Sequence, residues 1–423
     1  MAAAIAVALV VCSCARPCRG EVHFTVGTPE QGGQFATVQA AVDAVPAGNT
    51  ERHVIDVMPG TYTARVKIPS NKPLVTLRGQ DPQTTILTYN ETANTPPNES
   101  TVHASTVVQG ADFIAENLTF ANSFGQGVQA LAIYAKADRL IFNNCRFLGW
   151  QDTLRSEFGR QYFYNVYVEG SVDFIYGKGT AYFENSTLYA KSNGYVTAQA
   201  REGAAETNGY VFKNSTITGS AANGSVYLGR PWQAYARVVY LDSKMGPMVS
   251  PAGWSTWSGT NNHLTAYFAE FNSLDLNGNP LNVAQRVSWS HQLTSTEAEA
   301  FSKANWLGGA DGWNPVISVV PPELSGDYNA DGTVDAADYS VWRDRLESGT
   351  PLVNETASLG TIDAADYEAW KANFGAIANE GAGSAASLPE PAAILLVSTG
   401  VLSFIAGGAY GRQGQSYGEG HRR

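Results

Sequence analysis

Cysteine is scarce in this sequence, and its placement excludes a fold held together by disulfides. Only 4 cysteines occur in 423 residues, and Cys12, Cys14 and Cys18 fall within or just after an apolar N-terminal run. If that run is removed near Gly20, only Cys145 remains, and stability must come from the core. The string FNNCRF around it is typical of a small buried apolar residue rather than a nucleophile.

Charge is also scarce, and basic charge most of all. Charged residues make up 15% of the chain, with 38 acidic against 27 basic side chains and a net charge of -11. Because nucleic acids bind basic surfaces, this composition argues against a nucleic-acid partner. Glycine, by contrast, is abundant at 42 residues, and with many asparagines and threonines it indicates a turn-rich β protein. The length predicts two or three units.

Apolar runs at the two ends of the chain indicate export. Residues 1–20 contain MAAAIAVALVVCSCA, whose apolar run ends in small residues and predicts a secretory signal peptide, although no basic residue precedes it. Residues 389–412 combine Pro-Glu-Pro with an apolar stretch of about the length that spans a bilayer, and arginines follow. A polar linker rich in alanine and glycine, residues 376–388, precedes this segment.

Residues 21–320 form one large block that opens with a helical pattern. In FATVQAAVDAVP, the apolar residues Phe35, Val38, Val42 and Val45 recur at helical spacing. We therefore expect a short amphipathic helix that caps the open end of a solenoid.

A weak repeat, Asn-x-x-apolar, follows this helix at intervals of 20 to 29 residues. Its copies begin at Asn117, Asn144, Asn165, Asn185 and Asn214, with a variant at Asp242. The period, and the alternating β-formers around each copy, predict stacked coils of a parallel β-helix, because one coil cannot bury its own apolar face. Asparagine at one point of each coil can also form side-chain ladders and tolerate tight turns. A β-sandwich with recurring turns is the alternative.

Two aspartates share a phase in this repeat. Asp152 follows Asn144 by as many residues as Asp173 follows Asn165. In a parallel β-helix, equal phase places both in neighbouring coils about 5 Å apart, where two carboxylates cannot both ionise easily. One then serves as base or nucleophile and the other as proton donor. The spacing suits an ester hydrolase with an acyl-enzyme and a retaining glycosidase equally, and it also suits aspartates that only cap turns.

Other residues near these aspartates favour ester hydrolysis. Gln151 and Gln129 offer neutral amide donors of the kind that a tetrahedral oxyanion needs. Arg230, in YLGRPW, offers a fixed charge that could keep one aspartate ionised. Trp232 and Trp254 are candidates for stacking on sugar rings, although either could equally be a core residue.

The strings GVQALAI, GWQDTL, GSVDFIYG, TAQAR, YLGRPW and GWSTW occur in this order, and the set resembles the pectin methylesterase (pectinesterase) family over roughly residues 22–315. The resemblance implies a right-handed parallel β-helix, a single-stranded solenoid of the all-β class. It also implies removal of methyl esters from pectin through an aspartyl acyl-enzyme, which releases methanol and pectate. The chemistry of this family needs no catalytic metal or other cofactor.

The resemblance assigns a role to each matching residue. Asp173 of GSVDFIYG would be the nucleophile, and Asp152 of GWQDTL would protonate the departing methanol and then activate water. Gln129 and Gln151 would be the oxyanion donors, and Arg230 would hold the nucleophile. The expected substrate-binding residues are Trp232, Trp254 and Gln199.

Two departures from the family pattern are visible. Where members commonly read GxYxE, this chain has Gly60, Tyr62 and then Ala64. The usual string GTVDFIFG is here GSVDFIYG, a mild change. Neither departure removes a catalytic group.

An acidic loop opens a further unit, residues 327–375, which is expected to be a small α-helical, EF-hand-like module. Oxygen donors stand at EF-hand spacing, with glycine at the sixth position and a backbone donor at the seventh. A helix with Tyr339, Trp342 and Leu346 on one face should follow. The predicted Ca²⁺ ligands are Asp327, Asn329, Asp331, Thr333, Asp335 and Asp338. An acidic turn that binds no metal is the alternative.

This unit contains an internal duplication, in which TVDAADYSVW at residue 333 matches TIDAADYEAW at residue 361. The pattern resembles type I dockerin modules, which implies structural Ca²⁺ and binding to a cohesin-type protein partner. The second copy lacks the Asp-x-Asn-x-Asp ligands, so we expect one competent site and one weak or empty site. A helix pair that only spaces the enzyme from a surface is the alternative.

The C-terminal segment resembles a PEP-CTERM sorting signal of Gram-negative-type bacteria. This implies processing by sorting machinery at the membrane and a secreted or cell-surface location, with a permanent membrane anchor as the alternative.

Two rival functions stay open for the first unit. One is a polysaccharide-cleaving enzyme on the same fold, of the polygalacturonase or pectate lyase type. The other is a non-catalytic, carbohydrate-binding solenoid.

Overall fold

The computed structural model describes residues 21–95, 103–317, 324–329, 331–348, 352, 354 and 362–377. The predicted signal peptide, the predicted sorting segment and most of the predicted linker lie outside these residues. The chain forms two compact units, with the boundary after Ile317. Within the described ranges, no helix is both long and apolar enough to cross a membrane.

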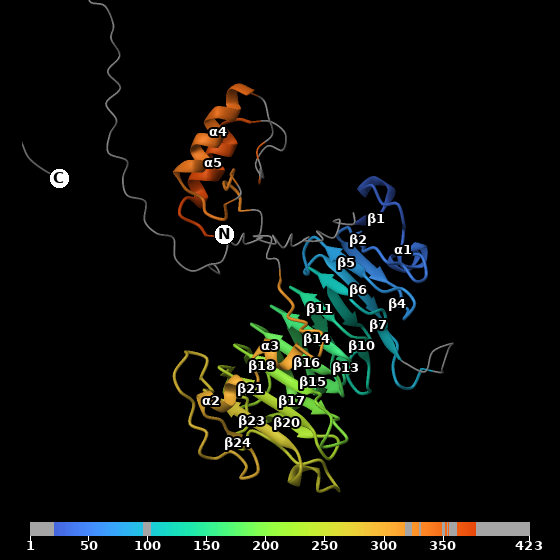
Figure 1. Ribbon diagram of the computed structural model, residues 1–423, viewed down its shortest axis with the longest axis vertical. Coiled ribbons are helices and arrows are strands. Elements are labelled where there is room, and N and C mark those ends of the chain that lie inside the picture. Colours follow the sequence, from blue (N-terminus) through green and yellow to red (C-terminus); the bar gives the residue numbers. More distant parts are fainter. Residues whose placement is uncertain are drawn as a thin grey trace, which may run out of the picture. The chain divides into compact units, whose positions relative to one another are not determined.

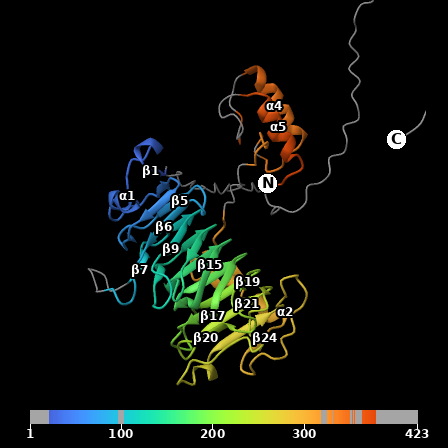
Figure 2. The same cartoon turned by 180° about the vertical axis from the view of Figure 1, so that it is seen from behind.

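The first unit is a stack of parallel strands, which Figures 1 and 2 show from opposite sides. Its first face is a sheet of 11 strands, and neighbours such as β1 with β2 or β21 with β23 pair in parallel. The order of this sheet is β1 (Val22–Val26), β2 (His53–Val57), β5 (Val75–Gly79), β8 (Ile114–Glu116), β11 (Leu140–Asn143), β14 (Arg160–Tyr164), β16 (Thr180–Glu184), β18 (Gly209–Lys213), β21 (Arg237–Leu241), β23 (Tyr267–Phe271) and β24 (His291–Gln292).

A second sheet of 13 strands supplies the other two faces. One face holds β3 (Gly60–Thr63), β6 (Thr85–Tyr89), β9 (Thr119–Asn122), β12 (Arg146–Leu148), β19 (Thr216–Gly219) and β22 (Lys244–Met245). The other holds β4 (Val66–Ile68), β7 (Ala104–Val108), β10 (Leu131–Lys136), β13 (Leu154–Phe158) and β20 (Val226–Pro231). The long strands β15 (Tyr167–Gly177) and β17 (Thr187–Gln199) run through both faces, since β15 pairs with β12 and then with β13.

The coils therefore wind into a parallel β-helix. Because each coil pairs with the next in the same direction, equivalent residues of successive coils lie one strand spacing apart. The predicted solenoid is confirmed, and the alternative of a β-sandwich is excluded.

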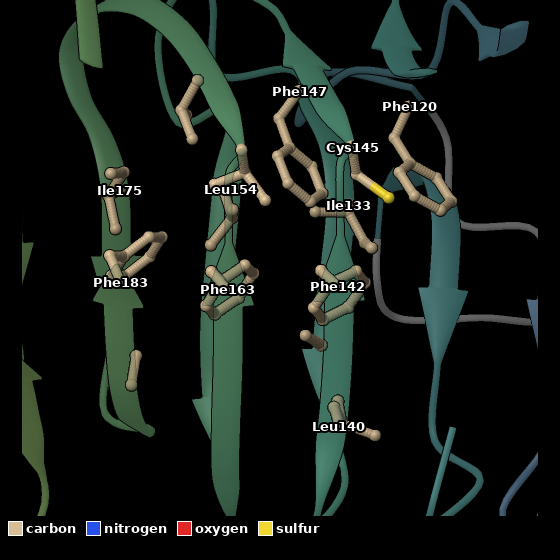
Figure 3. Close-up of a cluster of buried hydrophobic side chains, with 14 of the residues drawn as sticks. Phe120, Ile133, Leu140, Phe142, Cys145, Phe147, Leu154, Phe163, Ile175 and Phe183 are labelled. Atoms are coloured by element: carbon tan, nitrogen blue, oxygen red, sulfur yellow. The ribbon is translucent and has the colours of Figure 1, made fainter. Parts of the chain in front are cut away.

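Stacked aromatic side chains fill the interior, as Figure 3 shows for its central coils. Phe142, Phe163, Phe183 and Phe212 occupy equivalent register positions in successive coils. Their successive ring centroids lie 4.8, 4.3 and 4.6 Å apart in stacked orientations. Cys145 lies in the same cluster with 1% of its surface exposed, which confirms its predicted place in the core. Burial raises the pKa of its thiol to about 12, so it stays protonated.

The repeated asparagines mark one turn of each coil. Asn117, Asn144 and Asn165 all have left-handed backbone, with φ of 55°, 51° and 51°. Asparagine tolerates this conformation better than most residues. Nδ2 of Asn144 donates to Oδ1 of Asn117 at 2.7 Å, and Nδ2 of Asn165 donates to Oδ1 of Asn144 at 3.2 Å. The predicted ladder of side chains is therefore present.

Helix α1 (Val38–Ala44) lies at the N-terminal end of the β-helix and contacts β1, β2 and β4. Thr37 caps it by accepting a hydrogen bond from the backbone N–H of Ala40. Val38, Val42 and Val45 are buried, which confirms the predicted helix and its apolar face, and Phe35 packs against the same core. Helices α2 (Ser295–Glu299) and α3 (Lys303–Leu307) pack on the outer face of the 11-stranded sheet, and α3 contacts β16 near the middle of that sheet.

The described part of the second unit contains two helices, α4 (Ala336–Ser348) and α5 (Ala364–Asn373), which pack against each other. Tyr339 and Trp342 of α4 contact the ring of Tyr367 on α5, with centroids 6.1 and 5.2 Å away. The helix expected after the acidic loop is present, although Leu346 is 43% exposed.

The duplicated sequence gives a duplicated structure. Nε1 of Trp342 donates to the carbonyl of Asp363 at 3.0 Å, and Nε1 of Trp370 donates to the carbonyl of Asp335 at 2.7 Å. Each helix thus fixes the loop that precedes the other helix.

Candidate active site

The pairing of two coils brings Asp152 and Asp173 into register. Leu154 pairs with Ile175, 21 residues later, and the two aspartates are also 21 residues apart (175 − 154 and 173 − 152). They therefore lie side by side, one strand spacing apart. The backbone N–H of Asp152 donates to the carbonyl of Val172 at 3.1 Å, which continues this pairing. This is the arrangement that the repeat predicts.

A left-handed backbone turns both carboxyl groups out of the core. Asp152 has φ of 65° and Asp173 has φ of 51°. Side chains normally alternate between the two faces of a strand, yet Phe174 and Ile175, which follow Asp173, are both fully buried. The irregularity at Asp173 therefore leaves two apolar side chains in the core and points the carboxyl group the other way. Such backbone conformations are concentrated at functional sites.

A pocket of about 260 Å³ opens over the two aspartates. Its wall combines carboxylate, amide, guanidinium and aromatic groups from several coils. The lining residues are Gln129, Gln151, Asp152, Asp173, Tyr176, Ala198, Arg230, Trp232 and Trp257. The structure thus brings together both predicted aspartates, both glutamines, the arginine and one of the two predicted tryptophans.

Arg230 contacts Asp173 through two nitrogen atoms. Its Nε lies 2.9 Å from Oδ1 and its Nη2 lies 2.6 Å from Oδ2. The guanidinium is sandwiched between the rings of Tyr195 and Trp257, at 4.0 and 4.2 Å. Burial raises the pKa of Asp173, and the bonds and charge of Arg230 oppose that rise. A two-point contact of this kind fixes the carboxylate plane as well as its charge.

Asp152 has the more strongly perturbed carboxyl group. Burial, followed by the charge of Asp173, raises the pKa of Asp152 to about 7. The charges of Arg155 and Arg230, and a hydrogen bond with Tyr176, partly offset this rise. A pair of carboxyl groups whose proton affinities are pushed apart is suited to acid-base work near neutral pH.

Gln129 and Gln151 lie beside each other in adjacent coils, where they form an isolated parallel bridge. The backbone N–H of Ala130 donates to the carbonyl of Gln151 at 3.2 Å, and that of Ala93 donates to the carbonyl of Gln129 at 3.0 Å. Both side chains line the pocket next to the aspartates. Their amide groups are thereby held on strand backbone, where donors can be fixed before a substrate arrives.

Two predicted substrate contacts lie elsewhere. Trp254 is 1% exposed and packs on Phe268 in the core, at 4.6 Å between centroids. It is paired with Gly229, whose row faces inward. Gln199 is fully buried, and its Oε1 accepts the backbone N–H groups of Arg201 and Arg237 at 2.9 and 2.8 Å. Neither residue lines the pocket, because both fall on the inward-facing side of the strand alternation.

Trp257 and Tyr176 line the pocket but were not among the predicted site residues. Trp257 lies three residues beyond Trp254 in the same GWSTW string, and its ring centroid is 6.3 Å from that of Trp232. The ring centroid of Tyr176 lies 5.9 Å from that of Trp232. Tyr176 belongs to the string GSVDFIYG, which departs from the family pattern. The sequence signal that could have pointed to Tyr176 was this departure, since a tyrosine stands where the family string has phenylalanine.

A larger hollow of about 510 Å³ lies near β22, lined by residues that include Met245, Val249 and Leu281. Its charged groups are Asp275 and Arg286, and Arg286 is already paired with Glu270 at 2.8 Å. It carries no pair of carboxyl groups, so the smaller pocket is the better candidate for catalysis.

The acidic loop of the second unit is organised around two buried carboxylates. Oδ1 and Oδ2 of Asp327 accept the backbone N–H groups of Asp331 and Gly332 at 3.1 and 2.9 Å. Asp338, fully buried, accepts those of Asn329 and Asp335 at 3.0 and 2.8 Å. Within the described residues, however, no three acidic, histidine or cysteine side chains gather closely enough to hold a metal ion.

Comparisons with known proteins identify the family. The family model described as Pectinesterase matches residues 24–310. Pectinesterase 31 of Arabidopsis thaliana is 42% identical over 279 residues, which cover 64% of this chain and 87% of that protein. Putative pectinesterase 11 of the same plant is 36% identical over 291 residues, which cover 68% of this chain and 79% of that protein.

Solved structures agree with this assignment. Pectin methylesterase from carrot matches with a TM-score of 0.63 and 28% identity, over 69% of this chain and 93% of that chain. The enzyme from Aspergillus niger matches with a TM-score of 0.61 and 28% identity, over 68% and 94%. The matches cover the β-helix that carries the pocket. The chain therefore belongs to the pectinesterase family, and its activity is the hydrolysis of pectin methyl esters.

Proposed function

We propose that Asp173 is the nucleophile and Asp152 the proton carrier of this esterase. A carboxylate oxygen of Asp173 attacks the carbonyl carbon of the methyl ester, and the bond from that carbon to the methoxy oxygen breaks. Asp152 gives its proton to the departing oxygen, which leaves as methanol. The observation that carries this proposal is the register of the two aspartates, with Arg230 bound to only one of them.

The second half of the reaction returns every group to its starting state. Asp152, now a carboxylate, accepts a proton from water while the water oxygen attacks the acyl carbon. The bond between that carbon and the Asp173 oxygen breaks, which releases the Asp173 carboxylate and the free uronic acid, and the acid then loses its proton to solvent. Every group in this scheme is a side chain or water.

The electrostatics support this division of roles. A pKa of about 7 leaves Asp152 protonated in a large share of molecules near neutral pH, as a general acid requires. Arg230 stabilises the ionised form of Asp173, as a carboxylate nucleophile requires. The reverse assignment would place the proton on the aspartate that accepts two bonds from a guanidinium.

Gln129 and Gln151 are proposed to donate to the oxyanion that forms when the ester carbonyl is attacked. Both line the pocket from the coils that precede Asp173. Neutral amides suit this task, because they stabilise the developing charge without competing with Arg230 for Asp173. Trp232 and Trp257 would hold the uronate ring, since sugar C–H faces pack on aromatic rings.

Product analysis distinguishes hydrolysis of methyl esters from cleavage of the polysaccharide chain by an enzyme with the same fold. We expect methyl-esterified pectin to release methanol without new reducing ends or unsaturated uronates. Appearance of either product in step with methanol would reject the esterase mechanism. Asp173→Ala should abolish methanol release and leave the folded state intact. If the protein were a non-catalytic binding solenoid, the unsubstituted protein would release no methanol either.

For the second unit we propose a structural Ca²⁺ site in the loop of residues 327–338. The spacing of its oxygen donors and the backbone bonds to Asp327 and Asp338 support this role. Burial and the charge of Asp327 raise the pKa of Asp338, so the two carboxylates repel each other and a cation would relieve that repulsion. The ligands would be Asp327, Asn329, Asp331, Thr333, Asp335 and Asp338.

Binding to a cohesin-type partner is the proposed use of this unit. The matching pair of bonds from Trp342 and Trp370 supports a module with two equivalent halves. A pull-down with type I cohesins, with and without a chelator, tests it. No retention would favour the simple spacer, and retention that survives the chelator would show that partner binding does not depend on the proposed Ca²⁺ site.

The two terminal segments support a proposed route of export. Residues 1–20 would direct secretion, and residues 389–412 would be read by sorting machinery at the membrane, leaving a secreted or cell-surface enzyme. Both lie outside the described residues. Fractionation of a bacterial host that carries the sorting system, with intact mass of the exported chain, would distinguish processing from a permanent anchor.

A further inference from the structure

Gln129, one of the two proposed oxyanion donors, lies on an exposed connection between β9 and β10. Residues 123–129 form this connection, and each of them is exposed or half-buried. Gly125 and Gly127 have φ of 101° and 116°, and a side chain added at either glycine would meet open space. The middle of the connection is therefore not packed against other coils. The position of Gln129 must be set through the backbone at the two ends of the connection.

Asn122, the last residue of β9, joins these two ends. Its side chain is 7% exposed, although it is polar. Its Nδ2 donates to the carbonyl of Leu131, the first residue of β10, at 3.0 Å. Its Oδ1 accepts the backbone N–H of Phe124, at the start of the connection, at 3.0 Å. One side chain thus closes the base of the connection that carries Gln129.

The same amide group also reaches the preceding coil. Nδ2 of Asn122 donates to the carbonyl of Glu91 at 2.7 Å, so both donors of the amide are used. Two residues after Glu91, the backbone N–H of Ala93 donates to the carbonyl of Gln129 at 3.0 Å. Asn122 therefore fixes the turn whose backbone holds Gln129, as well as the strand that begins two residues after Gln129.

We propose that Asn122 is a positioning residue, which holds the backbone of Gln129 so that its side-chain amide meets the oxyanion. The inference deepens the proposed role of Gln129 and rests on it. Donors of an oxyanion site act at about 2.7 to 3.1 Å from the developing charge, so a small shift of the backbone removes their benefit. The ground-state ester carries less charge on its carbonyl oxygen and depends less on this placement.

Steady-state kinetics of methanol release from methyl-esterified pectin test the inference. We expect Asn122→Ala to lower kcat and kcat/KM by about 10-fold each and to leave KM within about twofold, because the lost interaction is made in the transition state. Asn122→Asp keeps the shape of the side chain and the acceptor for Phe124 but loses the two amide donors. It should show the same pattern, and it serves as the test if Asn122→Ala does not fold. Full kcat in a folded variant of either kind would overturn the inference.

Asn49 gives a matched control away from the pocket. It is 9% exposed, and its Nδ2 donates to the carbonyls of Glu51 and Pro73 at 3.0 and 2.6 Å. It does not line the pocket. Asn49→Ala should lower the melting temperature about as much as Asn122→Ala does and leave kcat unchanged. Equal losses of kcat in the two variants would reduce the effect of Asn122 to general destabilisation and overturn the inference.

A double variant shows whether Asn122 acts through Gln129. Gln129→Ala alone should lower kcat by about 100-fold. Adding Asn122→Ala should slow that variant by no more than about twofold, because the side chain that Asn122 positions is already gone. A further 10-fold loss in the double variant would place the effect of Asn122 elsewhere and overturn the inference. Full kcat in Gln129→Ala would instead refute the proposed oxyanion role of Gln129, a result that does not depend on any Asn122 variant.

Discussion

Arg230 reaches back across a whole coil to bind Asp173. Its backbone is paired with Ala198, and Ala198 is paired with Tyr176, so the arginine stands two coils beyond the aspartate that it contacts at 2.6 and 2.9 Å. Tyr195 and Trp257 clamp the guanidinium on its flat faces. Three coils therefore hold in place the charge that keeps the proposed nucleophile ionised.

Replacing Arg230 by lysine tests this geometry. Lysine keeps the charge but loses both the two-point contact and the stacking, so we expect kcat/KM to fall by roughly 10- to 100-fold. Loss of the bonds should also raise the pKa of Asp173 and move the acid limb of the profile to higher pH. Arg237→Lys is the control, since Arg237 also stacks on a tryptophan, Trp306 at 4.6 Å, but lies outside the pocket lining. Equal losses in the two variants would contradict the specific role of Arg230.

The perturbed carboxyl group of Asp152 should destabilise the folded enzyme at high pH. Its pKa is about 7 when folded and close to 4 in an unfolded chain, so the unfolded state releases its proton first as pH rises. Stability is therefore lost between about pH 4 and pH 7. Asp152→Asn removes the buried charge and should raise the free energy of unfolding at pH 8 by about 1 to 3 kcal/mol, but not at pH 4.

Denaturant unfolding at both pH values measures this effect. Asp275→Asn is the control, because hydrogen bonds from Asn279 lower the pKa of that exposed carboxyl group. Removing it should not stabilise the protein at pH 8. A gain for Asp152→Asn that is equal at pH 4 and pH 8 would contradict the assigned titration.

The two tryptophans of the GWSTW string should respond differently to truncation. Trp254→Ala leaves a cavity in the core and should cost about 3 to 5 kcal/mol of stability. Trp257→Ala should change stability by less than about 1 kcal/mol and raise KM about fivefold through the lost ring contact. Thermal unfolding and steady-state kinetics on both variants check this. A KM effect confined to Trp254→Ala would reverse our assignment.

Calcium binding should involve about one ion per chain. Calorimetry on the full chain is expected to show one Ca²⁺ site, which Asp327→Ala removes because Asp327 is the first proposed ligand of the copy that keeps the Asp-x-Asn-x-Asp pattern. Asp275→Ala, in an exposed aspartate turn of the first unit, is the matched control and should bind as the parent does. Methanol release should be unchanged in both variants. Two equal sites, or none, would contradict the proposed loop.

Much of the candidate active site was predictable because, in a solenoid, residues that are one repeat apart in the sequence lie next to each other in neighbouring coils. Asp152 and Asp173 share a phase relative to Asn144 and Asn165, and parallel stacking turns equal phase into contact. The prediction that Trp254 and Gln199 contact the substrate is not supported by their positions, for a related reason. Their strings lie beside the pocket, but the alternation of side chains in each strand turns both residues into the core.

The sequence by itself determined the coil period, the asparagine ladder and the identity of the catalytic candidates, since each depends on residue type and spacing along the chain. Only the tertiary structure decided which way side chains point where the alternation breaks. At Asp173 the left-handed backbone sends Phe174 and Ile175 into the core together and turns the carboxyl group outward. The tertiary structure also sets the proton affinity of Asp152, because that affinity depends on burial and on charges from other coils.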